Sequence, residues 1–284
     1  MRCHMSSVAD GGFHHLPPAP ARLAAVLARP KVVAAACIVA LVALGWVFLA
    51  LLSARGLGPL ALLCRPSTGA GPVWNAADYL TVAGMWAAMV LAMMLPSAAP
   101  MIVTYAEIAE TAARKGEPIV SPLLIASGYT AVWLGFAASA ALVQFALTQN
   151  APFGSALMGA PISGTFFIVA GLYQFSALKH ACLAQCRAPF PFFFAHWQTT
   201  ARGVFRLGLR QGLYCLGCCW AMMLLMLAAG TMNAIWMAVL GMTMALEKIG
   251  GGRPLSYGLG ASLIALGVSV IAMSFAAGWP LPGI

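Results

Sequence analysis

Residues 211–226 read Gln-Gly-Leu-Tyr-Cys-Leu-Gly-Cys-Cys-Trp-Ala-Met-Met-Leu-Leu-Met, and this stretch decides the kind of fold that the chain can form. Most of its side chains are apolar, which is typical of a membrane helix rather than a solvated loop. A helix turns by about 100° per residue and would place five sulfur-bearing side chains within an arc of about 100°. They are Cys215, Cys218, Cys219, Met222 and Met226.

This sulfur face has two interpretations. Thiolates and thioethers are the ligands that select soft metals, Cu(I) above all, and cysteines at this spacing can close on one ion. Cysteine and methionine are also ordinary residues of a packed apolar core. The spacing of Cys215, Cys218 and Cys219 therefore indicates either a metal site or close packing.

The composition of the whole chain extends the membrane interpretation. Its 284 residues are 62% hydrophobic and only 7% charged, with a mean hydropathy of +0.91. In an average soluble domain about a quarter of the residues are charged. We therefore predict an all-α, polytopic transmembrane helix bundle whose surroundings are the lipid bilayer. The net charge of +9 is not concentrated in a basic, aromatic-rich soluble segment, so we expect no nucleic-acid partner.

About 20 apolar residues are needed to span a bilayer, and seven segments reach or approach that length. They are 32–53, 79–105, 121–147, 161–180, 207–230, 233–249 and 256–277. Residues 1–30 are predicted to form a polar cytoplasmic tail, and 31–284 the transmembrane helical domain.

The basic residues indicate the orientation of these spans. Seven alternating spans place 13 lysines and arginines on one side and only Arg55 and Arg65 on the other. Because cytoplasmic loops carry the excess of basic residues, we predict a cytoplasmic N-terminus and a periplasmic C-terminus in a bacterial inner membrane.

The second predicted span contains Pro96 and Pro100 after a run of methionines that includes Met89 and Met93. Each proline removes a backbone donor, so the helix should kink or break there and free carbonyl groups. Broken membrane helices often line a cavity or an ion site, and the methionines would then form a thioether path. A kink that serves packing alone is the alternative.

A second group of candidate ligands closes the fourth predicted span. His180, Cys182 and Cys186 lie within seven residues, and Cys182 and Cys186 are one helical turn apart. On the predicted topology they reach the cytoplasmic leaflet, where the fifth span begins with Cys215. Glu247 ends the sixth span at the same leaflet, as a further metal-site candidate or as a partner of Lys248.

The remaining cysteines stand apart from these groups. Cys3, Cys37 and Cys64 are isolated in the sequence, and we expect no metal role for them. Clustering of the other five does not suit a disulfide framework and favours reduced thiols or metal ligands.

Four stretches resemble a bacterial family described as predicted metal-binding integral membrane proteins, a family of unknown function. They are Met85–Met101, Gly171–Pro189, Gly212–Trp220 and Thr231–Gly250, with Cys-Leu-Gly-Cys-Cys-Trp as the most specific string. The resemblance covers most of residues 79–250 and implies metal binding through the same cysteines. It supports Cys182 and Cys186 more strongly than His180, and it implies no catalytic residues.

Three classes of function fit these features. We predict a protein that binds a soft transition metal, most simply Cu(I), in transport or delivery, with a metallochaperone or a metal-dependent membrane enzyme as partner. A membrane oxidoreductase using the cysteines as redox thiols or as a metal centre is the second class, and a non-catalytic subunit whose sulfur residues only pack is the third. The sequence has no Walker loop, no Ser-His-Asp arrangement and no paired carboxylates, which argues against an ATP-driven pump and a hydrolase. Whether the protein is an enzyme stays open.

Overall fold

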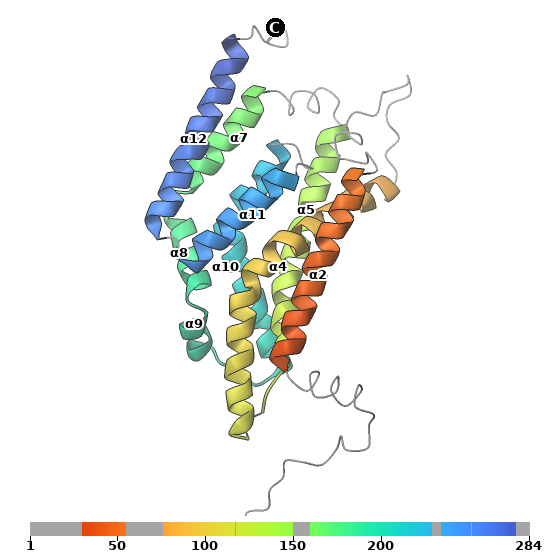
Figure 1. Ribbon diagram of the computed structural model, residues 1–284, viewed down its shortest axis with the longest axis vertical. Coiled ribbons are helices and arrows are strands. Elements are labelled where there is room, and N and C mark those ends of the chain that lie inside the picture. Colours follow the sequence, from red (N-terminus) through yellow and green to blue (C-terminus); the bar gives the residue numbers. More distant parts are fainter. Residues whose placement is uncertain are drawn as a thin grey trace, which may run out of the picture.

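The structure is a computed structural model and describes residues 30–54, 76–116, 118–149, 160–228, 234–250 and 252–276. All regular elements in these ranges are α-helices, which agrees with the predicted all-α class. The elements are α2 (Pro30–Ala54), α4 (Ala76–Arg114), α5 (Pro122–Gln149), α7 (Ala160–Tyr173), α8 (Ala177–Arg187), α9 (Pro189–Ala195), α10 (Ala201–Ala228), α11 (Ala234–Ile249) and α12 (Arg253–Ala276). Figure 1 shows them as an elongated bundle. The predicted tail at residues 1–30 lies almost wholly outside the described residues.

Five described helices are long and apolar enough to cross a membrane. These spans are Val32–Leu51, Tyr79–Arg114, Pro122–Gln144, Ala201–Met226 and Arg253–Ala276. The bent pair α7 and α8 raises the number to six if it counts as one span. The remaining predicted span, 233–249, corresponds to α11, whose 16 residues extend about 24 Å. A helical bundle is therefore supported, whereas the count of seven spans stays a prediction.

The predicted fourth span, 161–180, is bent in the structure. Helices α7 and α8 meet at 64° across the short break between Tyr173 and Ala177. Ser176 caps the new helix because its Oγ accepts a hydrogen bond from the backbone N–H of Lys179 at 3.1 Å. The bend turns α8, with its two cysteines, toward α10.

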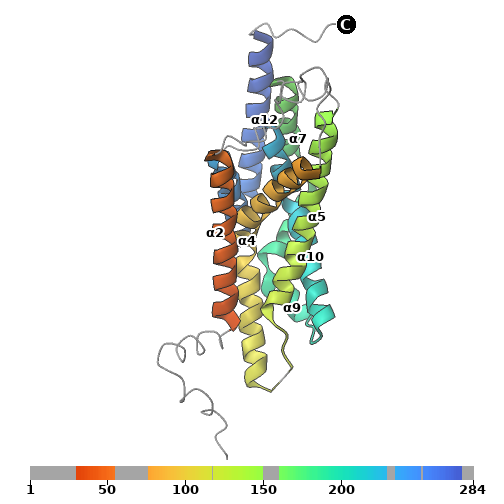
Figure 2. The same ribbon diagram turned by 90° about the vertical axis from the view of Figure 1, so that its right-hand side faces the viewer.

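Glycines allow two helix pairs to approach closely. Gly128 on α5 faces the backbone of Phe205 on α10, and Gly208 on α10 faces the backbone of α5 in return. Helices α7 and α12 meet in the same way, with Gly171 and Gly260 each lying against the other's carbonyl oxygen. Small residues of this kind let membrane helices pack backbone to backbone. Both views show α7 and α12 side by side (Figures 1 and 2).

Helix α4 runs through both of its prolines as one continuous helix, and it changes direction about half-way along its length (Figure 2). The structure thus shows the kink that the sequence allowed, without a break. Ser97 donates a hydrogen bond to the Met94 carbonyl oxygen at 2.8 Å, and the Tyr129 hydroxyl of α5 lies 3.2 Å from the same oxygen. The Met94 carbonyl oxygen therefore accepts hydrogen bonds from two hydroxyl groups, whereas the carbonyls that lose a helical N–H donor to Pro96 and Pro100 are those of Ala92 and Pro96.

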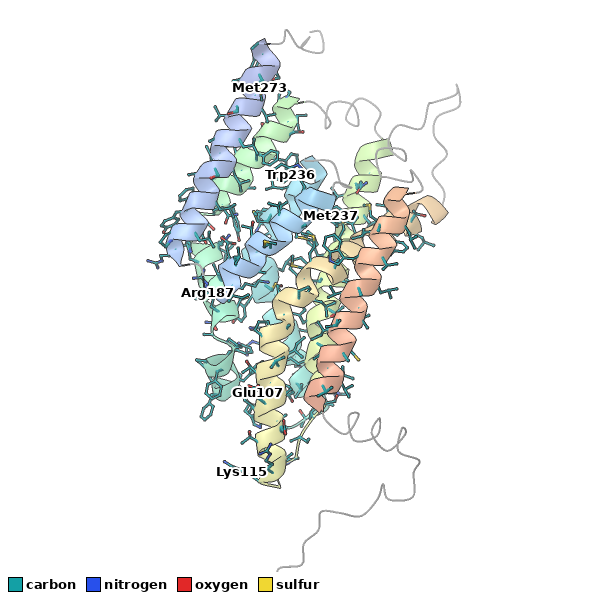
Figure 3. The ribbon with its side chains drawn as sticks, in the orientation of Figure 1. Glu107, Lys115, Arg187, Trp236, Met237 and Met273 are labelled. Atoms are coloured by element: carbon teal, nitrogen blue, oxygen red, sulfur yellow. The ribbon has the colours of Figure 1, made fainter. Side chains whose placement is uncertain are left out.

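One end of the bundle collects the basic helix ends and an aromatic cluster. The end of α4, the start of α5 and the start of α10 lie together there (Figure 1). Tyr105 of α4 packs edge-on against Phe193 of α9 at 5.5 Å and stacks on Trp197 at 5.6 Å. A cavity of about 500 Å³ opens between α4 and α9, beside Glu107 and Lys115. Figure 3 labels Glu107 on the lower half of α4 and Lys115 in the turn directly after this helix.

Candidate metal centre

The centre of the candidate site is the sulfur triad, which we define as Cys215, Cys218 and Cys219 on α10. Their Sγ atoms all lie within 4.8 Å of one another, and all three side chains are buried free thiols. The Sγ atoms of Cys218 and Cys219 are 3.2 Å apart. Cys218 also donates a hydrogen bond to the Cys215 carbonyl oxygen at 3.1 Å, which turns its sulfur along the helix. The structure therefore brings together the three cysteines that the helical spacing grouped.

Helix α8 brings the other two candidate cysteines to α10. The Cys186 thiol lies next to the thiols of Cys215 and Cys218, so it adjoins the sulfur triad. Cys182 lies over Gly217, where an added Cβ atom would come within 2.6 Å of its sulfur. The absence of a side chain at position 217 thus allows α8 to pack this closely. Cys186 thus lies beside the triad and Cys182 lies against the backbone of α10, and a ligand role for either stays a prediction.

Cys215 is surrounded by polar groups from three other helices. Lys248 of α11 donates hydrogen bonds to the Cys215 Sγ at 3.0 Å and to the Ser97 Oγ of α4 at 2.6 Å. The Tyr129 hydroxyl of α5 lies 2.9 Å from the same sulfur. An ammonium group at this distance compensates the negative charge that a thiolate ligand carries in apolar surroundings. Cys215 is therefore the point at which α4, α5, α10 and α11 meet.

Glu247 belongs to a second polar cluster. It is adjacent to Lys248 in the sequence, but its side chain points toward α8 and not toward Cys215. Its two carboxylate oxygens each accept a hydrogen bond from the Lys179 Nζ at 2.8 Å, and Ser256 of α12 donates to one of them at 2.7 Å. Gln174 also bonds the Lys179 ammonium through its side-chain oxygen. Lys179 and Glu247 are 0% and 2% exposed. Glu247 forms its ion pair with Lys179 and not with Lys248, the partner that one of the two interpretations of the sequence gave it, and a ligand role for Glu247 stays a prediction.

The other candidate ligands lie near the triad or on its edge. The His180 ring packs edge-on against Tyr257 of α12 at 5.3 Å, and its Nε2 has no hydrogen-bond partner within the described part of the chain. The predicted thioether ligands are buried in the same apolar core as the cysteines, and their role as ligands stays a prediction. They are Met89, Met93, Met222 and Met226. Figure 3 shows the sulfur atoms of this core between α4 and α11.

Sequence reasoning missed three polar side chains of the site. Ser97 and Tyr129 were not distinguished from other residues of their helices, and Lys179 was counted among basic residues at the membrane edge. These residues could have been noticed because each is a lone polar residue in an apolar segment, and such a residue normally has a buried partner. The identity of that partner depends on how helices distant in the sequence pack together, and the local sequence does not reveal this packing.

A family model described as PpoB2, copper chaperone, matches residues 83–270. The chain belongs to this family. The matched part is about two thirds of the chain and runs from α4 into α12, so it contains both the sulfur triad and the Glu247 cluster. Membership in the PpoB2 family confirms that the chain is related to metal-handling proteins, and it does not single out the membrane family of the resemblance. No curated protein and no solved structure is detectably similar to the chain.

Proposed function

We propose that the protein binds Cu(I) at the sulfur triad, with Cys186 as a fourth sulfur, and that it holds copper for transport or delivery. The observation that carries this proposal is three buried free thiols whose sulfur atoms lie within 4.8 Å of one another. Thiolates select soft metals, copper is the metal that the PpoB2 description names, and Cu(I) is the soft ion of copper.

The surroundings of the triad suit a monovalent soft ion. Apart from the polar groups around Cys215, the triad lies in an apolar core, and methionine side chains are buried in the same core. Thioether ligands carry no proton, so they can take part in copper binding without adding negative charge to a low-dielectric site. Lys248 supplies one fixed positive charge at the Cys215 Sγ. We assign Met89, Met93, Met222 and Met226 to a thioether path beside the triad, and Cys182 and His180 to its edge.

A further part of the proposal concerns location and partners. Five apolar helices of sufficient length support a position in a bilayer. We propose the bacterial inner membrane, with a cytoplasmic N-terminus and a periplasmic C-terminus. The triad would then receive copper from a metallochaperone or pass it to a metal-dependent membrane enzyme.

The copper proposal predicts stoichiometric and stabilising binding. Protein purified under reducing conditions and loaded with Cu(I) should retain about one copper per chain after free metal is removed. Because a ligand that binds only the folded state stabilises it by mass action, free Cu(I) at 100 times the Kd should raise the free energy of unfolding by about 2.7 kcal/mol. Metal analysis and thermal unfolding in detergent measure the two effects. Retention of no copper by the reduced wild-type protein would leave the sulfur residues as packing.

The topology proposal predicts where reporters become active. Fusions in the segment 188–200 should report the cytoplasm, and fusions at the C-terminus should report the periplasm, because the basic residues favour the inner side. A cytoplasmic C-terminus would rule out seven alternating spans with this orientation. The copper experiment is independent of that outcome.

A further inference from the structure

Both ends of α8 are attached to a single residue of α11. Near its start, Lys179 donates to both carboxylate oxygens of Glu247 at 2.8 Å. At its last residue, Arg187 donates through Nε to the Glu247 backbone carbonyl oxygen at 2.7 Å. Figure 3 shows Arg187 beside the end of α11. Cys182 and Cys186 lie between the two attachments, so their position depends on residue 247.

Helix α8 also packs on α10, where Cys182 lies against Gly217, but the chain that precedes it gives it little support. The helix follows the 64° bend after α7, and its 11 residues are too few to form a stable helix without packing. A buried ammonium without a partner is strongly unfavourable in apolar surroundings. The ion pair therefore adds to the packing on α10 that holds α8 in place, and loss of the Glu247 charge would drive Lys179 out toward a polar environment.

Neighbouring residues of α11 serve the two halves of the sulfur site. Successive side chains on a helix point about 100° apart, so Glu247 reaches α8 while Lys248 reaches Cys215 on α10. One turn of α11 thus contacts both the helix that carries Cys186 and the helix that carries the triad.

We propose that Glu247 is a positioning residue that holds Cys186 against the sulfur triad and so completes the copper site. This inference rests on the proposed copper function, and it assigns Glu247 no direct contact with the metal. Outer groups that orient metal ligands typically change the affinity 10- to 100-fold when they are removed.

The first measurement needs no metal. In wild-type full-length protein, a short bifunctional thiol reagent should join Cys186 to a triad cysteine, and mass spectrometry of the digested protein measures the yield. Glu247→Gln should reduce that yield several-fold because α8 leaves its place on α10. The matched control is Glu110→Gln, which removes a carboxylate from the exposed Glu110–Arg114 pair at 3.0 Å and should leave the yield unchanged.

The second measurement compares the Cu(I) affinity of the same variants. Glu247→Gln should weaken binding about 10- to 100-fold, and the charge-swapped pair Lys179→Glu with Glu247→Lys should restore both affinity and cross-linking. If Glu247→Gln does not fold, Ser256→Ala removes one hydrogen bond to the carboxylate and should give a smaller loss in both measurements.

Three outcomes separate the possibilities. Wild-type cross-linking in Glu247→Gln, whether or not the affinity falls, overturns the positioning role, and a fall in affinity alone would make Glu247 a ligand. Reduced cross-linking together with reduced Cu(I) affinity in Glu247→Gln supports the positioning role. Absence of copper binding in the wild type, together with reduced cross-linking in Glu247→Gln, removes the copper function and keeps the role of Glu247 in placing α8.

Discussion

Replacement of Cys215, Cys218 and Cys219 by serine is expected to reduce the bound copper to background while the protein still folds. Serine preserves the size of each side chain and can still donate to the carbonyl that Cys218 bonds and accept from Lys248. A hydroxyl is a hard and weak ligand for Cu(I), so the metal loses its binding energy while the packing of α10 changes little. Metal analysis of the reduced, copper-loaded variant measures the effect.

Cys37→Ser is the matched control for the triple variant. Cys37 lies on α2 and does not belong to the sulfur triad, so its replacement should leave the copper content unchanged. A triple variant with full copper occupancy would show that the ion binds elsewhere. In that case the three thiols would serve packing, as the alternative interpretation of the sequence allowed.

The second large effect is expected at the contact between α5 and α10. Gly128→Leu should strongly destabilise the native structure, because even an added Cβ atom would overlap the carbonyl oxygen of Phe205. Overpacking of a core usually costs about 1–3 kcal/mol, and a clash with backbone lies at the upper end because no rotamer relieves it. Tyr129, the next residue, would move away from the Cys215 Sγ. The yield of folded protein and its thermal unfolding in detergent measure the loss.

The control for this variant is another glycine of the same helix. Gly135 has open space where its side chain would be, so Gly135→Leu should not reduce stability. A helix former in place of glycine should add up to about 1 kcal/mol. Equal behaviour of the two leucine variants would contradict the close helix contact.

The sulfur triad and most of the helices could be predicted because they depend on local spacing. Cys215, Cys218 and Cys219 share a face through the helical repeat alone, and apolar length identifies most of the spans. The bend before α8 could also have been found, since Ser176 is a strong helix-capping residue. The ion pair between Lys179 and Glu247 could not, because it joins residues that only tertiary packing brings together.

The proline-containing helix illustrates the same limit. Pro96 predicts a kink, but the sequence does not say which way the two halves of α4 point. The structure turns Ser97 toward Lys248 at 2.6 Å, and this direction follows from the packing of α4 on α5 and α11. Prolines therefore indicated where the helix changes direction, while its neighbours determine what that change brings together.

The short helix α11 also bears on how the protein is assembled. Glu247 and Lys248 end a helix of only 16 residues, and a charged residue placed within lipid costs about 2.5–3.5 kcal/mol on insertion scales. The residues that neutralise them, including Lys179 and Cys215, are synthesised earlier, and Ser256 is synthesised just after. In the proposed membrane location, α11 would therefore insert stably only beside helices that are already in the bilayer. Chains that fail to complete the cysteine site would there leave charges facing lipid.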